Sequence, residues 1–275
     1  MLEFSGYLRS VVDESDDNGD TPTQMPHWFS DIVKSDRIIV EAAPGIFSVV
    51  AKPKSNMALE RLPSLTPDYI RQDFRSYFTW GSSRKDYAAF CTKAIESHSE
   101  GVVLDIGGCS LSYSANAYVE ECRSVVVVEH SISALKKAHR KVKKAIGRVP
   151  SNFVFLQADF RELPFLDGVF SVVLALGALN TVGAIWELVQ HTKRVAARPG
   201  EIYMTSLALT GRWLGDKKLD ALHKEGKLAF KPRTVFDLSD RLARRNDGVD
   251  LQVRGNVVYV VMSCEETKDA GDLAA

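Results

Sequence analysis

The chain has 275 residues, 45% of them hydrophobic, and its 35 basic and 35 acidic side chains give a formal net charge of zero. This length suits one large α/β domain with an extension, or two small domains. The balanced charge argues against a dedicated nucleic-acid binder, whose domain is usually strongly basic. No apolar run approaches the roughly 18 residues of a membrane helix, so no membrane span is expected.

The beginning of the chain lacks the basic-then-apolar pattern of a secretory signal, which makes a cytoplasmic location the expectation. The four cysteines are far apart in sequence and form no C-x-x-C pair. Neither a disulfide framework nor a structural zinc site is therefore expected.

Residues 1–65 form the first predicted unit, an acidic leader followed by a small hairpin. Five acidic side chains between Asp13 and Asp20 predict a solvated segment. The β-rich runs 37–41 and 46–51 are joined by a Pro-Gly turn signal, which predicts the hairpin.

Residues 66–99 are predicted to form a helical cap that leads into the main domain. Thr66-Pro67-Asp68 has the composition of a helix start, and an apolar stripe predicts a second helix from about Ser83 to Ser97.

Residues 100–264 show the densest pattern, in which short apolar strands alternate with helices. Strands are expected at 102–106, 124–128, 152–156, 169–175 and 201–207, with helices at 131–146 and from 186 to about 200. A helical insert (210–246) and a closing hairpin (249–253 with 257–262) follow, and 265–275 form a polar tail. The pattern predicts a Rossmann-like, doubly wound α/β fold with a mostly parallel seven-stranded sheet and a C-terminal antiparallel hairpin.

Ligands of such sheets bind beyond the carboxyl ends of the strands, so the residues that follow each strand are the candidates. The first strand leads into Asp105, Gly107 and Gly108, whose glycines let a ligand approach the backbone closely. Glu129 follows the second strand and can accept hydrogen bonds from both hydroxyls of a ribose. Asp159 and Phe160 follow the third strand. Three acids at three successive strand ends suit a nucleoside-bearing ligand.

These segments resemble class I S-adenosylmethionine-dependent methyltransferases, in particular the small-molecule branch that includes quinone-biosynthesis enzymes. The resemblance is carried by four segments and covers about residues 100 to 263: Leu104-Asp105-Ile106-Gly107-Gly108, Val128-Glu129, the run from Ala158 to Val173, and Arg194 to Gly200. The sequence departs from the family pattern where Cys109 and Leu111 replace the second and third glycines of the loop.

The resemblance implies S-adenosylmethionine as the cofactor and a role for each candidate residue. Asp105 and the loop of Gly107, Gly108 and Cys109 would face the methionine moiety. Glu129 would bind the ribose, with His130 packed on the adenine. The remaining contacts would come from Asp159 and Phe160 to the adenine, and from the backbone of Ala175 and Leu176 to the methionine.

The predicted function is in-line methyl transfer to a small-molecule acceptor, with no general base and no oligomeric state assigned. The altered glycine loop keeps open an alternative, a methyltransferase-like binding or regulatory protein without turnover. A less favoured alternative is an RNA or protein methyltransferase that uses the basic helix 131–146, which carries six Lys and Arg residues and no acid.

Overall fold

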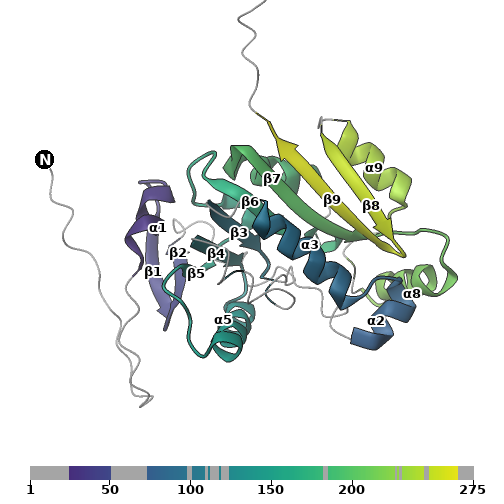
Figure 1. Cartoon of the computed structure of the whole chain (residues 1–275), viewed down its shortest axis with the longest axis horizontal. Helices are drawn as coiled ribbons and strands as arrows, with labels where there is room; N and C mark the ends of the chain where they lie inside the picture. The colour runs from purple at the N-terminus through teal and green to yellow at the C-terminus, as the bar shows by residue number, and fades with distance from the viewer. Residues whose placement is uncertain are drawn as a thin grey trace, which may run out of the picture.

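A computed structural model describes residues 25–50, 73–97, 101–108, 111, 118, 124–181, 185–226, 228, 231–244 and 248–265. Within this part of the chain, nine strands form one sheet in the order β1-β2-β5-β4-β3-β6-β7-β9-β8 (Figure 1). The strands are β1 (Ile38–Ala43), β2 (Ile46–Val50), β3 (Val102–Ile106), β4 (Ser124–Glu129), β5 (Phe153–Gln157), β6 (Phe170–Ala175), β7 (Ala196–Leu207), β8 (Val249–Arg254) and β9 (Val257–Cys264).

The sheet is parallel from β2 to β7, while β1 and the β8–β9 hairpin add antiparallel strands at its two ends. The chain winds outward from β3 to β5 on one side, then returns to β6 and β7 on the other. Strand order therefore reverses between β3 and β6, the position at which doubly wound sheets bind ligands. The predicted α/β fold is confirmed.

The predicted number of seven strands is wrong, because the N-terminal hairpin joins the sheet. Ile46, Phe47 and Ser48 pair in parallel with Phe155, Leu156 and Gln157 of β5. The hairpin therefore covers an edge of β5 that would otherwise present unpaired backbone groups. Local sequence predicts a hairpin here but carries no signal for this long-range pairing.

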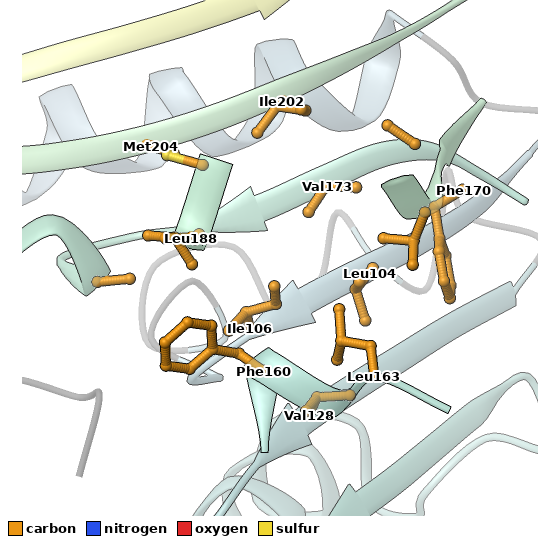
Figure 2. Close-up of a cluster of buried hydrophobic side chains, with 14 of the residues drawn as sticks. Leu104, Ile106, Val128, Phe160, Leu163, Phe170, Val173, Leu188, Ile202 and Met204 are labelled. Atoms are coloured by element: carbon orange, nitrogen blue, oxygen red, sulfur yellow. The ribbon is translucent and has the colours of Figure 1, made fainter. Parts of the chain in front are cut away.

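Helices cover both faces of the sheet, and the sheet separates the two larger hydrophobic clusters. On one face α3 (Arg84–Glu96) and α5 (Ile132–Ile146) pack over residues such as Val125 and Val127. On the other, α7 (Ile185–Val195) and α9 (Val235–Ala243) pack over residues such as Val126 and Val128. Figure 2 shows part of this cluster, including Val128 and Leu188 of α7. This alternation follows from the two-residue period of a strand and explains why the strands are apolar throughout.

The shorter elements are α1 (His27–Ile32), α2 (Asp73–Trp80), the 3₁₀ turn η3 (Phe160–Glu162), α6 (Ala178–Thr181) and α8 (Trp213–Lys224). None of the helices in the described ranges is long and apolar enough to cross a bilayer.

Two predicted helices have the expected ends. α3 begins after a capping box between Ser83 and Asp86, and α5 ends at Gly147, which adopts the left-handed conformation. The helix predicted to end near residue 200 stops at Val195, because Ala196 already pairs with Phe170. The predicted helix start at Thr66-Pro67-Asp68, the acidic leader and most of the polar tail lie outside the described residues.

Candidate active site

The predicted site residues lie where four neighbouring parallel strands end. Gly107 and Gly108 follow β3, Glu129 ends β4, Asp159 follows β5, and Ala175 ends β6. The register pairs Ile106 with Val128 and Glu129 with Gln157, which brings these ends to one edge of the sheet.

Glu129 is the most constrained acid of the site, with 1% of its surface exposed. Its Oε1 accepts hydrogen bonds from the backbone N–H groups of His130 (2.9 Å) and Ser131 (3.2 Å), and lies 2.6 Å from Nδ1 of His130. Its Oε2 is equally buried and has no hydrogen-bond partner among the described residues. A buried carboxylate oxygen without a donor is costly, so this atom indicates a ligand that supplies one.

His130 is held from the neighbouring strands. The amide Nε2 of Gln157 donates to the carbonyl oxygen of His130 (2.9 Å), and the hydroxyl of Ser48 donates to Oε1 of Gln157 (2.9 Å). The N-terminal hairpin thus supports the residue that contacts Glu129. Sequence reasoning missed Gln157 and Ser48. The only local signal is the polar Gln157 at the end of an otherwise apolar strand.

The glycine loop is anchored to the sheet at its first residue. Gly107 has φ +91° and donates its N–H to the carbonyl of Val128 (2.7 Å). Gly108 has φ +59°, and a Cβ on it would lie 3.2 Å from Cγ1 of Val127 and 3.6 Å from the Cβ of Ala138. Gly108 therefore allows both a left-handed backbone and close packing between the loop and α5.

Of the two residues that replace family glycines, only Leu111 lies within the described part of the chain. Cys109 lies outside the described residues. Leu111 is buried in the hydrophobic core with Val127 and Leu135. Its side chain therefore packs into the α3–α5 core of the domain. Asp105 is fully buried in β3, in register with Val127 and Leu174.

Asp159 lies at the same edge, and its carboxylate already has a partner. Its oxygens accept from the guanidinium of Arg161 at 2.5 to 3.1 Å, and Oδ1 also accepts from the N–H of Arg161 (2.9 Å). These contacts cap η3 and raise the pKa of Arg161, chiefly through the side-chain hydrogen bond. A ligand amine would share this carboxylate with the guanidinium.

Phe160 packs inward, in the same cluster as Ile106 and Leu188 on the α7 side of the sheet (Figure 2), with 8% of its surface exposed. Its ring meets that of His191 edge-on at a centroid distance of 6.5 Å. Phe160 lies at the predicted edge of the sheet, but most of its ring surface contacts the hydrophobic core.

Ala175 and Leu176 are buried, and the turn after them is tied to β7. Gly177 donates its N–H to the hydroxyl of Thr205 (2.8 Å), and Oδ1 of Asn180 accepts from the N–H of Leu207 (3.0 Å). Sequence reasoning did not assign Thr205 to the site, although a polar residue near the end of an apolar strand was a signal.

Arg233 adds a cationic group near this turn that sequence reasoning also missed. Its Nη1 donates to the carbonyl of Leu179 (2.9 Å), and its own backbone carbonyl accepts from the N–H of Leu209 (2.7 Å). The side chain is half-buried, and burial lowers the pKa of Arg233 to about 10. It still carries a positive charge at neutral pH.

Within the described residues, no group of three His, Cys, Asp or Glu side chains gathers in a way that could hold a metal ion. The site is an edge of the sheet with buried and partly buried carboxylates, backbone amides, the guanidinium groups of Arg161 and Arg233, and apolar residues of the core. Such an arrangement can bind polyhydroxylated or cationic groups of an organic ligand.

The sequence profile of the methyltransferase domain matches residues 104–204, which run from β3 to β7 and contain all the site residues named above except Arg233, Ser48, Leu207, Leu209 and Thr205. No curated protein sequence gives a significant match.

Solved structures share the fold at low sequence identity. The N-methyltransferase NodS from Bradyrhizobium japonicum WM9, in complex with S-adenosyl-L-homocysteine, is 12% identical with a TM-score of 0.51, covering 76% of this chain and 98% of its own. The geranyl diphosphate C-methyltransferase from Streptomyces coelicolor A3(2) is 11% identical with a TM-score of 0.52, covering 66% of this chain and 79% of its own. It was solved with Mg²⁺, geranyl diphosphate and S-adenosyl-L-homocysteine.

Proposed function

Since residues 104–204 form a methyltransferase domain of the class I fold, we propose that the protein binds S-adenosylmethionine and transfers its methyl group to a small-molecule acceptor. The observation that carries the proposal is the buried Oε2 of Glu129, which has no hydrogen-bond partner among the described residues at the carboxyl end of β4. A ribose offers two hydroxyl donors, which suits the carboxylate at this position.

The donor set supports the cofactor. Glu129 would accept from the ribose hydroxyls, Asp159 from the exocyclic amine of the adenine, and the turn at Gly107 and Gly108 would leave room for the methionine moiety. The buried side chains of Ala175 and Leu176 provide an apolar wall beside it. When bound, S-adenosylmethionine supplies an activated methyl group on a sulfonium.

The chain's own contribution to the reaction is positional. Methyl transfer is an in-line displacement, and holding the acceptor atom at near-attack distance supplies most of the rate. The turn that contains Gly177 and Asn180 is anchored to β7 directly after Ala175 and Leu176, and the guanidinium of Arg233 binds the same turn. A positive charge there favours an acceptor whose reacting atom is anionic, which needs no general base.

A second candidate is a protein that binds S-adenosylmethionine without turnover. Its support is the glycine loop, where Leu111 takes the place of a family glycine and packs into the core. Such a protein would keep Glu129 and its partners but would lack a productive acceptor site.

The basic face of α5 supports a third candidate, methylation of RNA or protein. Its exposed cations are Lys136, Lys137, Arg140, Lys143 and Lys144. A polyanion bound there would dissociate as salt rises. The zero net charge of the chain favours the small-molecule acceptor over this alternative.

One experiment separates the three candidates. The full chain is incubated with S-adenosylmethionine labelled on the methyl group and with the small-molecule, RNA and protein fractions of a cell extract. Label in the small-molecule fraction is the expected result. Label only in RNA or protein would favour the third candidate, and binding of the cofactor without any label transfer would favour the second. Quinone-type acceptors and a cytoplasmic location stay predictions.

A further inference from the structure

Large apolar side chains gather on the outer surface of two helices that contact each other. Tyr77 and Phe78 of α2 are 52% and 56% exposed, and Trp213 and Leu214 of α8 are 70% and 54% exposed. Single exposed apolar residues are ordinary, but a cluster of them marks an interaction surface. We call these four residues the α2–α8 patch.

The two halves of the α2–α8 patch adjoin one another. Helices α2 and α8 are in contact and lie side by side in Figure 1. Gly81, which follows α2 and donates its N–H to the carbonyl of Tyr77, lies so close to Arg212 that a Cβ on it would be 2.8 Å from Cζ of that guanidinium. Arg212 directly precedes Trp213. The end of α2 therefore lies beside the residue that precedes α8, which brings the two halves of the patch to neighbouring helix ends.

The patch is not required by the packing of these helices. Their inner sides already bury Trp80, Leu219 and Leu222 in a core with Leu207 and Tyr259. The four patch residues thus add apolar surface on the side that faces away from this core.

Exposed cations outnumber exposed acids along α8 and its two flanking residues. Arg212, Lys217, Lys218 and Lys224 are exposed along the helix, whereas the exposed acids there are Asp220 and Glu225. The ammonium of Lys217 lies 5.0 Å from the centroid of the Trp213 ring. Tryptophan and tyrosine rings flanked by lysines are typical of helices that lie at a lipid–water interface.

The shape of the patch also favours a deformable partner. Side chains that are more than half exposed protrude from the surface, whereas the walls of a rigid pocket would be more enclosed. A cavity of about 150 Å³ between α3 and the β8–β9 hairpin is lined by none of the four residues.

We infer that the α2–α8 patch docks the protein onto an anionic lipid surface, with Trp213, Leu214, Tyr77 and Phe78 entering the headgroup region and the lysines of α8 contacting lipid phosphates. Helix α8 follows the carboxyl end of β7. In this parallel part of the sheet, that end lies at the same edge as the end of β4, which carries Glu129. The inference goes beyond the proposed function and does not depend on methyl transfer.

The test is co-sedimentation of the full chain with phosphatidylcholine vesicles, with and without phosphatidylserine, across about 50 to 500 mM salt. The wild type should bind the phosphatidylserine vesicles and be released as salt rises. The double variant Trp213→Ser/Leu214→Ser should bind at least about tenfold more weakly. The matched control Leu166→Ser/Val253→Ser removes exposed apolar side chains elsewhere on the surface and should bind like the wild type.

Three outcomes would overturn the inference. The first is a wild type that does not bind phosphatidylserine vesicles, or binds phosphatidylcholine alone equally well. The second is binding that survives in Trp213→Ser/Leu214→Ser but is lost in Lys136→Gln/Arg140→Gln/Lys144→Gln, which would assign it to α5. The third is self-association of the wild type that the patch variant abolishes without any change in vesicle binding, which would make a second copy the occupant. Melting curves by circular dichroism should be unchanged in the patch variant, because the substituted groups face solvent.

Discussion

Nδ1 of His130 lies 2.6 Å from Oε1 of Glu129, at the end of a strand where both side chains are buried. This contact and two backbone N–H groups saturate Oε1, while Oε2 has no partner within the described part of the chain. His130 therefore fixes the orientation of the carboxylate, and Oε2 is the oxygen available to a ligand.

Replacing His130 tests this positioning role. In His130→Ala the carboxylate loses one of its three contacts, and we expect the affinity for S-adenosylmethionine to fall about tenfold, or about 1.4 kcal/mol. His130→Asn, which keeps a side-chain donor, should recover part of the loss. Isothermal titration calorimetry measures both. Equal affinity in all three proteins would show that His130 does not orient Glu129.

The predicted adenine contact of Asp159 is tested with an analogue. S-inosylhomocysteine carries an oxygen where S-adenosylhomocysteine carries the exocyclic amine, so the wild type should prefer the adenosyl compound by about tenfold. Asp159→Ala should bind the two compounds with similar affinity. A preference that persists in the variant would mean that Asp159 serves only to hold Arg161.

Replacing Gly108 by alanine is expected to lower the stability of the fold more than replacing Gly147, although both glycines have a positive φ. Gly147→Ala places a Cβ in open space, so its cost is the backbone strain alone, about 1–2 kcal/mol. Gly108→Ala carries the same strain and also crowds Val127, which should add about 1 kcal/mol. Urea unfolding of the two variants gives the comparison. Equal losses of stability would contradict the close packing of this loop on α5.

Asp86 should make the stability of the fold depend on pH. Burial alone would raise the pKa of Asp86, but hydrogen bonds from the N–H and hydroxyl of Ser83 and the guanidinium of Arg254 outweigh it, so the pKa lies below its ordinary value of 3.8. A lowered pKa in the folded state means that the stabilisation is fully present above the unfolded pKa and is lost as pH falls through the folded one. The unfolding free energy of Asp86→Asn should therefore decline less below about pH 4 than that of the wild type.

Arg254→Gln provides the companion measurement, since it removes one of the groups that lower this pKa. The decline of its unfolding free energy below about pH 4 should lie between the declines of the wild type and Asp86→Asn. Parallel acid profiles in all three proteins would show that this ion pair contributes nothing to stability.

The sequence predicted most of the sheet and the positions of Glu129 and Asp159 at the strand ends, because continuous apolar strands and the acids at their carboxyl ends are local signals. Asp105 lies inside β3. It could not predict that Arg161, two residues away, would engage Asp159, because that depends on the 3₁₀ turn between them. The support of His130 by Gln157 and Ser48 depends on strand pairing over about a hundred residues. The same long-range pairing explains why the sheet has nine strands.

The most direct measurement is a calorimetric titration of S-adenosylmethionine into the wild type, Glu129→Gln and the control Glu96→Gln, which changes an exposed acid at the end of α3. The wild type and the control should bind with equal dissociation constants below about 1 mM. Glu129→Gln should bind about 30- to 150-fold more weakly, in line with about 2–3 kcal/mol for charge-assisted hydrogen bonds to the ribose. No heat with the wild type up to millimolar ligand, or undiminished affinity in Glu129→Gln, would contradict the assignment of this site.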